Sequence, residues 1–307
     1  MPMNKTEIYI LSGFLGSGKT TLLKRLLEDE KKHDRKVAVM MNELGAVSID
    51  SDAVGEDVAL KELLGGCICC TMSGQVEGQL QGLLQVEKPD AIYVETTGAA
   101  HPVEILDALV SPLFADQIEP KGIITTVDGQ RWLDRSKLGP QLQRLLLEQV
   151  RHADYVIVNK AGVLSEKEQA DVSISIQALN PHAKCILTDY SKTPLQDIRK
   201  LSSVPGKQER THIHTKDLGL GTYVHTFSKP VDREAFEQFL RSLPENMYRI
   251  KGYVKYKGSA YPELFQYSYG MPSYMKEYMN MPLNMVFIGE EVNWESLKET
   301  LVALEDI

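Results

Sequence analysis

The sequence predicts an α/β fold: a doubly wound, mostly parallel sheet, followed by a smaller α+β domain. In roughly the first two-thirds of the 307 residues, short apolar runs alternate with amphipathic helical stretches. The runs lack the period-two alternation of a half-exposed strand, which is typical of parallel sheets covered by helices on both faces. Beyond residue 220 the order of the elements changes, which indicates a second domain of another kind.

Six apolar runs are the predicted strands of the first domain. They are Ile8–Leu11, Val37–Met41, Ala91–Val94, Ile123–Val127, Tyr155–Val158 and Ile186–Leu187. Helical patterns lie between them: Leu22, Leu23, Leu26 and Leu27 share one helix face, as do Leu142, Leu145, Leu146 and Gln149. Strands alternating with helices favour a doubly wound sheet.

A polar stretch without apolar period separates the two domains. We predict a doubly wound α/β domain over 1–202, a linker over 203–220 and an α+β domain with an antiparallel sheet over 221–307. The predicted elements of the second domain are strands at Thr222–Phe227, Tyr248–Tyr256, Glu263–Tyr269 and Asn284–Ile288, with helices at Asp232–Leu243 and Trp294–Leu304.

Composition narrows the class of protein. The hydrophobic share of 43% and charged share of 25% are ordinary for a globular chain, and the net charge of −8 argues against nucleic acid or an anionic membrane as partner. No apolar run approaches the roughly 20 residues that span a bilayer. The polar start is no secretory signal, so we expect a cytoplasmic protein.

The loop Gly13–Thr20 reads Gly-Phe-Leu-Gly-Ser-Gly-Lys-Thr and fits the P-loop pattern in full. Its glycines allow successive backbone N–H groups to face phosphates, and the following helix adds a positive N-terminus. A glycine-rich turn without a phosphate role is the alternative, which the flanking strand and helix disfavour. The predicted nucleotide-binding residues here are Gly13, Gly16, Ser17, Gly18, Lys19, Thr20 and Thr21. Lys19 is expected at the β and γ phosphates and Thr20 at Mg²⁺.

Glu95 ends the strand that follows the P-loop motif by some 75 residues. A carboxylate at such a strand end binds Mg²⁺ or polarises the attacking water in P-loop enzymes, so we predict Lys19 and Glu95 as catalytic residues. Taken alone, an acid at a strand end is a common solvent-facing residue. Gly98, three residues on, is a predicted γ-phosphate contact through its N–H.

A switch loop is predicted where the chain leaves the second strand, in Asn42-Glu-Leu-Gly-Ala-Val-Ser-Ile-Asp50. Asp50 is a candidate Mg²⁺ ligand and Glu43 a candidate ligand of a second metal. For both residues a solvated loop acid is the competing interpretation.

Asn159 and Lys160 resemble the start of the guanine-specificity motif and are predicted to bind the nucleotide. In that motif an Asp stands two residues after the Lys and pairs with guanine N1–H and N2–H₂. Here the position is Gly162, which offers no carboxylate. Base preference is therefore left open between GTP and ATP.

Three of the four cysteines lie within Gly65-Gly-Cys-Ile-Cys-Cys70. Closely spaced thiolates suit Zn²⁺ or a similar metal, and the small ligand set fits a site that passes its ion on. A redox pair and buried structural thiols are the alternatives. Cys185 is read as a buried small hydrophobe. Four histidines are left undecided as ligands: His101, His212, His214 and His225.

Four motifs in this order resemble the CobW family of P-loop GTPases, proposed metal chaperones and insertases: the P-loop, Asn-Glu-Leu-Gly, Gly-Gly-Cys-Ile-Cys-Cys and Glu-Thr-Thr-Gly. The resemblance extends to about Thr188, and the second domain is similar to the family's smaller C-terminal domain. It implies hydrolysis of GTP with Mg²⁺ at Lys19, Thr20 and Glu95. It also implies Zn²⁺, or Co²⁺, at Cys67, Cys69, Cys70 and Glu43.

Three positions depart from the family pattern. Ala46 replaces an acid after the switch glycine, Gly162 replaces the guanine-reading Asp, and Ala99-Ala-His-Pro102 replaces Leu-Ala-Asp-Pro. A hydrolysis cycle that changes metal affinity is the expected mechanism, with a client metalloprotein as partner.

Two other classes of function stay open. One is an ATP-using P-loop kinase or transferase, which would need an acceptor site and an arginine-rich lid. The other is a nucleotide-gated scaffold that activates a partner metalloenzyme. The client, the physiological metal and self-association of the chain are left open.

Overall fold

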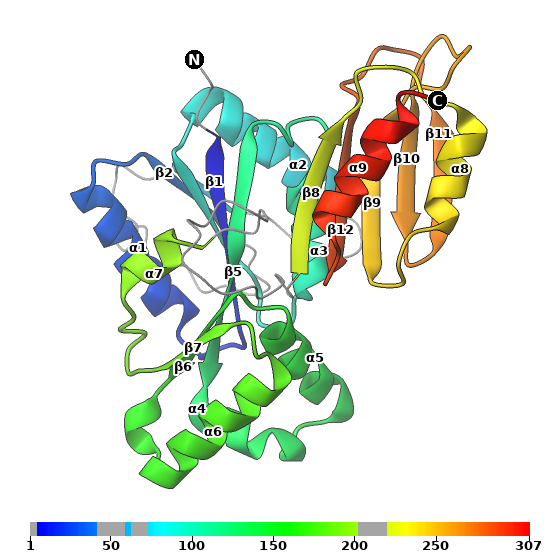
Figure 1. The fold of residues 1–307 in the computed structure, drawn as a ribbon. Helices are drawn as coiled ribbons and strands as arrows, with labels where there is room; N and C mark the ends of the chain where they lie inside the picture. The colour runs from blue at the N-terminus through cyan, green and yellow to red at the C-terminus, as the bar shows by residue number, and fades with distance from the viewer. Residues whose placement is uncertain (1–4, 42–58, 63–72, 202–219) are drawn as a thin grey trace. The chain divides into compact units, whose positions relative to one another are not determined.

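The computed structural model describes residues 5–41, 59–62, 73–201 and 220–307 (Figure 1). The predicted linker falls almost wholly outside these ranges. The chain divides into two compact units, one formed by 1–109 and 119–202 and the other by 110–118 and 203–307. A short segment before the fifth strand thus belongs with the C-terminal part of the chain, where Pro112 O accepts a 3.0 Å hydrogen bond from Asn284 Nδ2.

The larger unit is built on a sheet that has seven strands within the described ranges, in the order β3-β2-β4-β1-β5-β6-β7. Its strands are β1 (Thr6–Ser12), β2 (Val37–Met41), β3 (Ala59–Glu62), β4 (Ala91–Glu95), β5 (Ile118–Asp128), β6 (Tyr155–Asn159) and β7 (Lys184–Leu187). The neighbours β2–β3, β2–β4, β1–β4, β5–β6 and β6–β7 pair in parallel. The carboxyl ends of these strands therefore meet along one edge, where ligands of open α/β sheets bind.

Helices cover both faces of this sheet. They are α1 (Lys19–Lys32), α2 (Ser73–Gly82), α3 (Pro102–Leu109), α4 (Gly129–Leu133), α5 (Pro140–Arg151), α6 (Glu166–Leu179) and α7 (Leu195–Arg199), with short turns η2 (Leu83–Glu87), η3 (Asp134–Lys137) and η4 (Ala161–Val163). Alternate residues of β6 enter opposite cores: Tyr155 and Ile157 pack with α1 and α7, whereas Val156 and Val158 pack with α4, α5 and α6. Both faces are apolar for this reason, as the unalternating runs predicted.

The smaller unit carries an antiparallel sheet in the order β11-β10-β9-β12-β8. Its elements are β8 (Leu220–Thr226), α8 (Arg233–Arg241), β9 (Met247–Val254), β10 (Glu263–Ser268), β11 (Met271–Lys276), β12 (Asn284–Glu290) and α9 (Trp294–Leu304). Phe236, Phe265 and Phe287 are buried with Trp294 and Leu301 in one aromatic-rich core. The predicted α+β character is confirmed.

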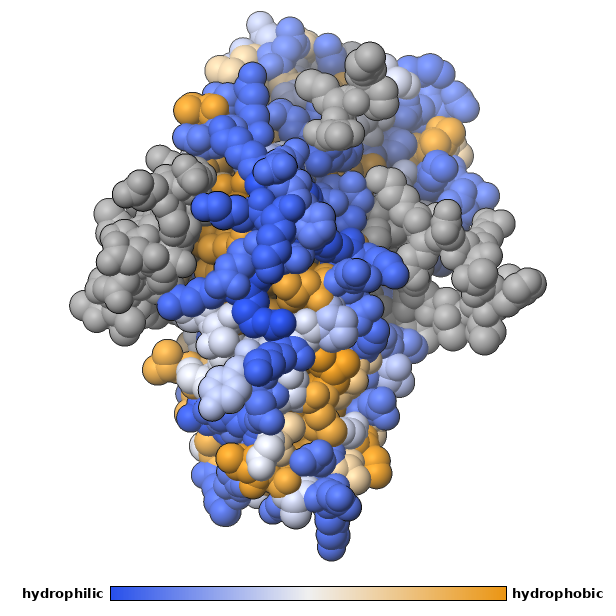
Figure 2. All heavy atoms as spheres, turned by 90° about the vertical axis from the view of Figure 1, so that its left-hand side faces the viewer, coloured by the Kyte–Doolittle hydropathy of each residue, from blue (hydrophilic) through white to orange (hydrophobic). Residues whose placement is uncertain are grey.

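The predicted fold class is confirmed, and two strands escaped prediction. The short β3 has the sequence Ala-Leu-Lys-Glu, which contains no apolar run. The edge strand β11 contains Pro272 and exposed side chains, and proline is tolerated only at a sheet edge or bulge. In the described ranges, no helix is long and apolar enough to cross a bilayer. The face in Figure 2 is largely hydrophilic, with hydrophobic side chains in patches between the polar ones.

Candidate nucleotide site

The loop between β1 and α1 is packed against two neighbouring strands. Gly13 has φ 129°, and a Cβ there would lie 2.2 Å from Thr126 O of β5. Gly18 has φ 115°, and a Cβ there would lie 2.3 Å from Asn159 Nδ2 at the end of β6. Only glycine combines these backbone angles with such close approach, so the two glycines seat the loop on the sheet.

Lys19 is the first residue of α1 and its side chain is folded onto the loop. Its Nζ donates to Gly13 O at 2.6 Å and to Phe14 O at 3.2 Å, and the residue is only 7% exposed. Burial lowers the pKa of Lys19, while the charge of Glu95 acts in the opposite direction. The loop thus holds a buried cation at the N-terminus of a helix, where negative groups are favoured.

Thr20 and Glu95 are brought together from elements 75 residues apart. The Thr20 hydroxyl donates to Glu95 Oε1 at 2.9 Å, and Glu95 at the end of β4 is 8% exposed. Ser17 is anchored differently, since its Oγ donates to Phe14 O at 2.7 Å and lies 2.7 Å from Thr126 Oγ1. Gly16 (φ 76°) and Thr21 lie on the exposed side of the loop and of α1.

Gly98 lies directly against the P-loop backbone. A Cβ at this position would be 2.7 Å from Leu15 N, so no larger residue fits without moving the loop. The carbonyl of Gly98 accepts a 3.1 Å hydrogen bond from Gln149 Nε2 of α5, which also donates to Ala100 O at 3.3 Å. The turn after β4 is therefore held between the P-loop and α5.

Asn159 connects the P-loop to the turn that follows β7. Its Nδ2 donates to Ser17 O at 2.8 Å and its Oδ1 accepts from Ser191 N at 2.9 Å. Ser191 Oγ in turn donates to Gly18 O at 3.1 Å. The side chain of Asn159 is buried and satisfied on both sides, so its role at the site is to join two loops.

The carboxylate of Asp189 lies against Gly162, the position at which the guanine-specificity motif has its own Asp. Gly162 N donates to Asp189 Oδ1 at 3.0 Å, and a Cβ on Gly162 would lie 2.7 Å from Asp189 Oδ2. Two backbone hydrogen bonds fix the turn that carries Asp189. Ala161 N donates to Thr188 O at 3.0 Å, and Thr188 N donates to Val158 O at 2.8 Å. The spacing of the motif does not reveal this carboxylate, because Asp189 comes 27 positions after Gly162 in the chain.

Lys160 pairs with a carboxylate on the neighbouring strand. Its Nζ lies 2.6 Å from Asp128 Oδ2, at the end of β5. Burial raises the pKa of Asp128, but the hydrogen bonds from Lys160 and from Arg131 N outweigh it and leave this pKa lowered. The ion pair holds Lys160, which has φ 60°, beside the turn that carries Gly162.

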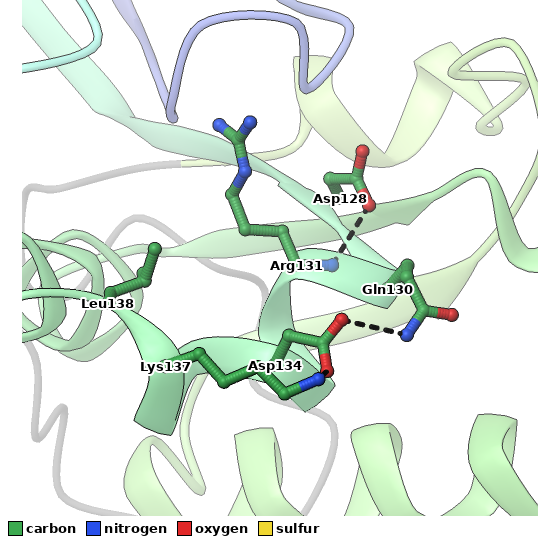
Figure 3. Close-up of a pocket in the computed structure, with 6 residues that line it drawn as sticks. All are labelled: Asp128, Gln130, Arg131, Asp134, Lys137 and Leu138. Atoms are coloured by element: carbon green, nitrogen blue, oxygen red, sulfur yellow. Dashed lines mark hydrogen bonds and ion pairs between the residues drawn. The ribbon is translucent and has the colours of Figure 1, made fainter.

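A cavity of about 330 Å³ flanks this region on α4 and η3 (Figure 3). It is lined by Asp128, Gln130, Arg131, Asp134, Lys137 and Leu138. Arg131 reaches back to the P-loop, where its Nη1 donates to Leu15 O at 3.1 Å. The P-loop residues themselves do not line this cavity.

Several predicted ligands lie outside the described residues. They are Glu43, Asp50, Cys67, Cys69 and Cys70, and the undecided histidines His212 and His214 lie outside them too. Of the other predicted residues, the structure brings together Lys19, Thr20, Glu95 and Gly98 at the loop, with Asn159 behind it.

Sequence reasoning missed three residues of the site. Asp128 and Asp189 follow the predicted strands at 123–127 and 186–187, so their place after a strand was the available signal. Gln149 was assigned only to a helix face, and its bonds to Gly98 and Ala100 depend on tertiary structure.

These contacts define a P-loop nucleotide-binding protein, since a glycine-rich loop enters a helix at Lys19-Thr20 and a strand-end carboxylate meets the Thr20 hydroxyl. The chain belongs to the family described as CobW/HypB/UreG, nucleotide-binding domain, whose model matches residues 7–187. Residues 220–305 match the cobalamin synthesis protein cobW C-terminal domain. The predicted family is confirmed.

Two curated relatives and one solved structure illustrate the similarity. The chain is 28% identical to the zinc-regulated GTPase metalloprotein activator 1 of Dictyostelium discoideum, over 75% of this chain and 58% of that protein. It is 31% identical to the zinc chaperone YeiR of Escherichia coli, over 70% of this chain and 66% of that protein. The chain thus spans less than two-thirds of either relative. The crystal structure of Zn(II)-bound YjiA GTPase from E. coli shares the fold, with a TM-score of 0.51, 23% identity and coverage of 98% and 99% of the two chains.

Proposed function

We propose that this chain is a Mg²⁺-dependent GTPase that binds Zn²⁺ or a similar transition metal and couples hydrolysis to metal delivery to a client protein. The observation that carries the proposal is the cluster of Lys19 and Thr20, at the end of the P-loop, with Glu95 at the end of β4. It occurs in a chain whose family includes proteins named as GTPases and zinc chaperones. A cytoplasmic location stays a prediction.

The pair of Thr20 and Glu95 fits Mg²⁺. A hydroxyl and a carboxylate oxygen 2.9 Å apart are the oxygen ligands that this ion prefers, and the remaining ligands come from phosphate and water. When bound, the ion neutralises charge that develops on the β and γ phosphate oxygens. Asp50, predicted as a further contact, lies outside the described residues.

The protein's own contribution to hydrolysis is position and charge. Lys19 carries a positive charge at the helix N-terminus and is held there by carbonyls of the loop. Glu95 is nearly buried, so its charge is little screened by water. Gly98 lets the turn after β4 approach the P-loop closely, which supports its N–H as the proposed γ-phosphate contact, and its carbonyl links the turn to α5.

Asp189 supports guanine as the base. Guanine offers N–H donors at N1 and N2, which a carboxylate accepts with both oxygens, whereas adenine has no such donor pair on that edge. Each carboxylate oxygen has more than one acceptor position, so the bond from Gly162 N leaves Asp189 able to accept both. We assign to Asp189 the role that the sequence pattern gives to an Asp at position 162.

Metal binding at Cys67, Cys69 and Cys70, with Glu43, is proposed from the sequence motif and from the printed names of the relatives. These residues lie in the chain between β2 and the turn that carries Gly98. If the nucleotide changes the affinity for metal, then metal must change the affinity for nucleotide by the same factor.

The first experiment compares binding of GTP and ATP to the metal-free full chain, and then phosphate release from each with Mg²⁺. Tighter binding of GTP and faster release from it are expected. Release from neither nucleotide, with or without Zn²⁺, would contradict an autonomous hydrolase and favour a partner-dependent switch. Tighter binding of ATP would remove guanine from the proposal.

A second experiment measures Zn²⁺ affinity with a non-hydrolysable GTP analogue and with GDP. Different affinities are expected if hydrolysis drives delivery. Equal affinities would leave a GTPase that binds metal without coupling the two.

A further inference from the structure

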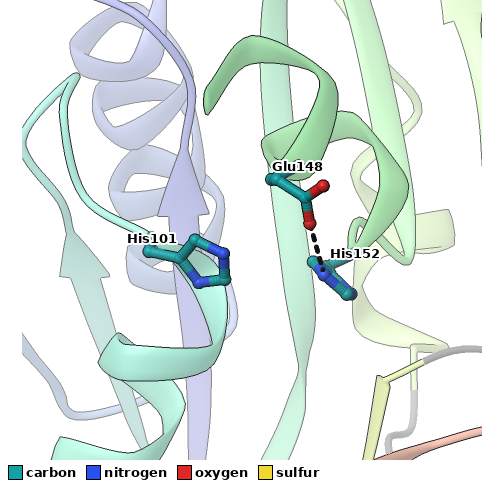
Figure 4. Close-up of side chains that lie close together, drawn as sticks. All are labelled: His101, Glu148 and His152. Carbon is teal, nitrogen blue, oxygen red and sulfur yellow. Dashed lines mark hydrogen bonds and ion pairs between the residues drawn. The ribbon is translucent and has the colours of Figure 1, made fainter. Parts of the chain in front are cut away.

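Two histidines and a glutamate converge where the turn after β4 approaches the end of α5 (Figure 4). His152 Nε2 lies 3.1 Å from Glu148 Oε2, and the rings of His101 and His152 are 6.0 Å apart between centroids. One ligand atom from each of the three residues lies within 4.8 Å of the other two. Two imidazoles and one carboxylate are the ligand set of zinc sites with an open fourth position.

The three side chains come from two well-defined elements. Glu148 and His152 are four residues apart at the end of α5, so they share one face of that helix. His101 directly precedes α3, and its carbonyl accepts from Ile105 N at 3.2 Å. Their placement therefore depends on folded helices within the larger unit.

An ion pair that caps the helix is the simpler account of two of these residues. Oppositely charged side chains at positions i and i+4, such as Glu148 and a protonated His152, stabilise helices. A cation is also favoured near a helix C-terminus. That account leaves out His101, which brings a second imidazole from another element. The Nδ1 atom of His101 is buried and makes no hydrogen bond to any residue that the structure describes.

We propose that His101, Glu148 and His152 form a second binding site for zinc or a similar divalent transition ion, separate from the cysteine motif. The site takes one ion through three protein ligands and leaves a position for water or another donor. It adjoins Gln149, whose side chain holds the carbonyls of Gly98 and Ala100. The site goes beyond the proposed function, because it needs neither nucleotide nor the cysteines.

The test starts from full-length protein in which all four cysteines, Cys67, Cys69, Cys70 and Cys185, are replaced by Ser. Zn²⁺ binding is measured by competition with a chromophoric chelator, and one bound ion per chain is expected. Adding His101→Ala or His152→Ala removes a ligand and should weaken Zn²⁺ binding by more than about 100-fold. Loss of a residue that only hydrogen-bonds to a ligand typically weakens metal binding by about 10- to 100-fold. No zinc binding to the cysteine-free protein overturns the proposal.

The matched control is His182→Ala, at an exposed histidine of the same unit. It should leave the Zn²⁺ affinity of the cysteine-free protein unchanged. Equal affinity in His101→Ala, His152→Ala and the control overturns the site.

A second measurement uses no histidine variant, so its result does not depend on whether the histidine variants fold. Histidines of the cysteine-free protein are modified with diethyl pyrocarbonate with and without Zn²⁺, and each position is quantified by mass spectrometry. Zn²⁺ should protect His101, which is partly exposed, and leave the exposed His182 equally reactive. Unchanged modification of His101 on addition of Zn²⁺ overturns the proposal.

Discussion

The proposed phosphate end and the proposed base end of the nucleotide site are built in different ways. At the phosphate end, one contiguous loop supplies Gly13, Gly18, Lys19 and Thr20, and a single distant residue, Glu95, completes it. At the base end, each contact crosses between segments: Asn159 reaches the turn after β7, and Asp189 from that turn reaches Gly162.

The difference explains what a sequence pattern can detect. Backbone N–H groups must converge on a phosphate, and a short glycine-rich loop does this locally. A base needs only one carboxylate in the right place, and any segment that passes there can supply it. The first solution leaves a fixed spacing in the sequence, whereas the second leaves none.

The largest effect is expected at the phosphate end. Lys19→Ala removes the buried cation of the loop, so GTP hydrolysis should fall about 100- to 1,000-fold. Phosphate release at saturating nucleotide measures it, with Lys24→Ala, an exposed lysine of the same helix, as control. A fall of less than tenfold in Lys19→Ala would mean that the loop does not act through this charge.

Asp189→Asn is expected to break the base end alone. The amide keeps one acceptor and gains a donor, so GTP affinity should fall about 10- to 100-fold. Xanthine has a carbonyl where guanine has its amino group, so this variant should bind XTP more tightly than GTP. Calorimetry with both nucleotides checks the inversion.

The control for this change is Asp171→Asn, at an exposed aspartate on α6. It should keep the preference for GTP. An Asp189→Asn protein with unchanged preference between XTP and GTP would show that Asp189 does not read the base.

Exchanging the two positions at the base end should give a smaller effect with a rescue. Gly162→Asp alone puts a second carboxylate against Asp189, where a Cβ would lie 2.7 Å from Asp189 Oδ2, and GTP affinity should fall about tenfold. Adding Asp189→Gly removes the repulsion and should restore most of the affinity. If the double variant binds no better than the single one, the two positions are not equivalent.

The smallest effect concerns the contact between the P-loop and the turn after β4. Gly98→Ala brings a Cβ to 2.7 Å from Leu15 N, so hydrolysis should fall by less than tenfold and stability by about 1–3 kcal/mol. Gly82→Ala, at the end of α2, is the matched control, because no described residue lies within 4 Å of a Cβ placed there. Helix propensity predicts a gain of up to about 1 kcal/mol for it in thermal unfolding. Equal stability of both variants would contradict the close packing at Gly98.

The sequence predicted most of the fold, whereas it points to only some residues of the candidate site, for physical reasons that differ by element. The strands β2, β4 and β6 of the larger sheet are buried on both faces, so their apolar runs are conspicuous, whereas the edge strand β11 is exposed and has no such run. Lys19, Thr20 and Glu95 follow from local spacing and a strand end. Asp189 and the cluster of His101, Glu148 and His152 arise only when the sheet brings distant segments together.

The late position of Asp189 has a practical consequence for work with fragments. The family match to the nucleotide-binding domain ends at residue 187, which is the last residue of β7. A fragment cut there would keep the whole P-loop and Glu95, yet it would lose Asp189 and also Ser191, which Asn159 holds. Such a fragment would report triphosphate binding faithfully while concealing which base the intact protein selects, so extending it past α7 at Arg199 is the safer boundary.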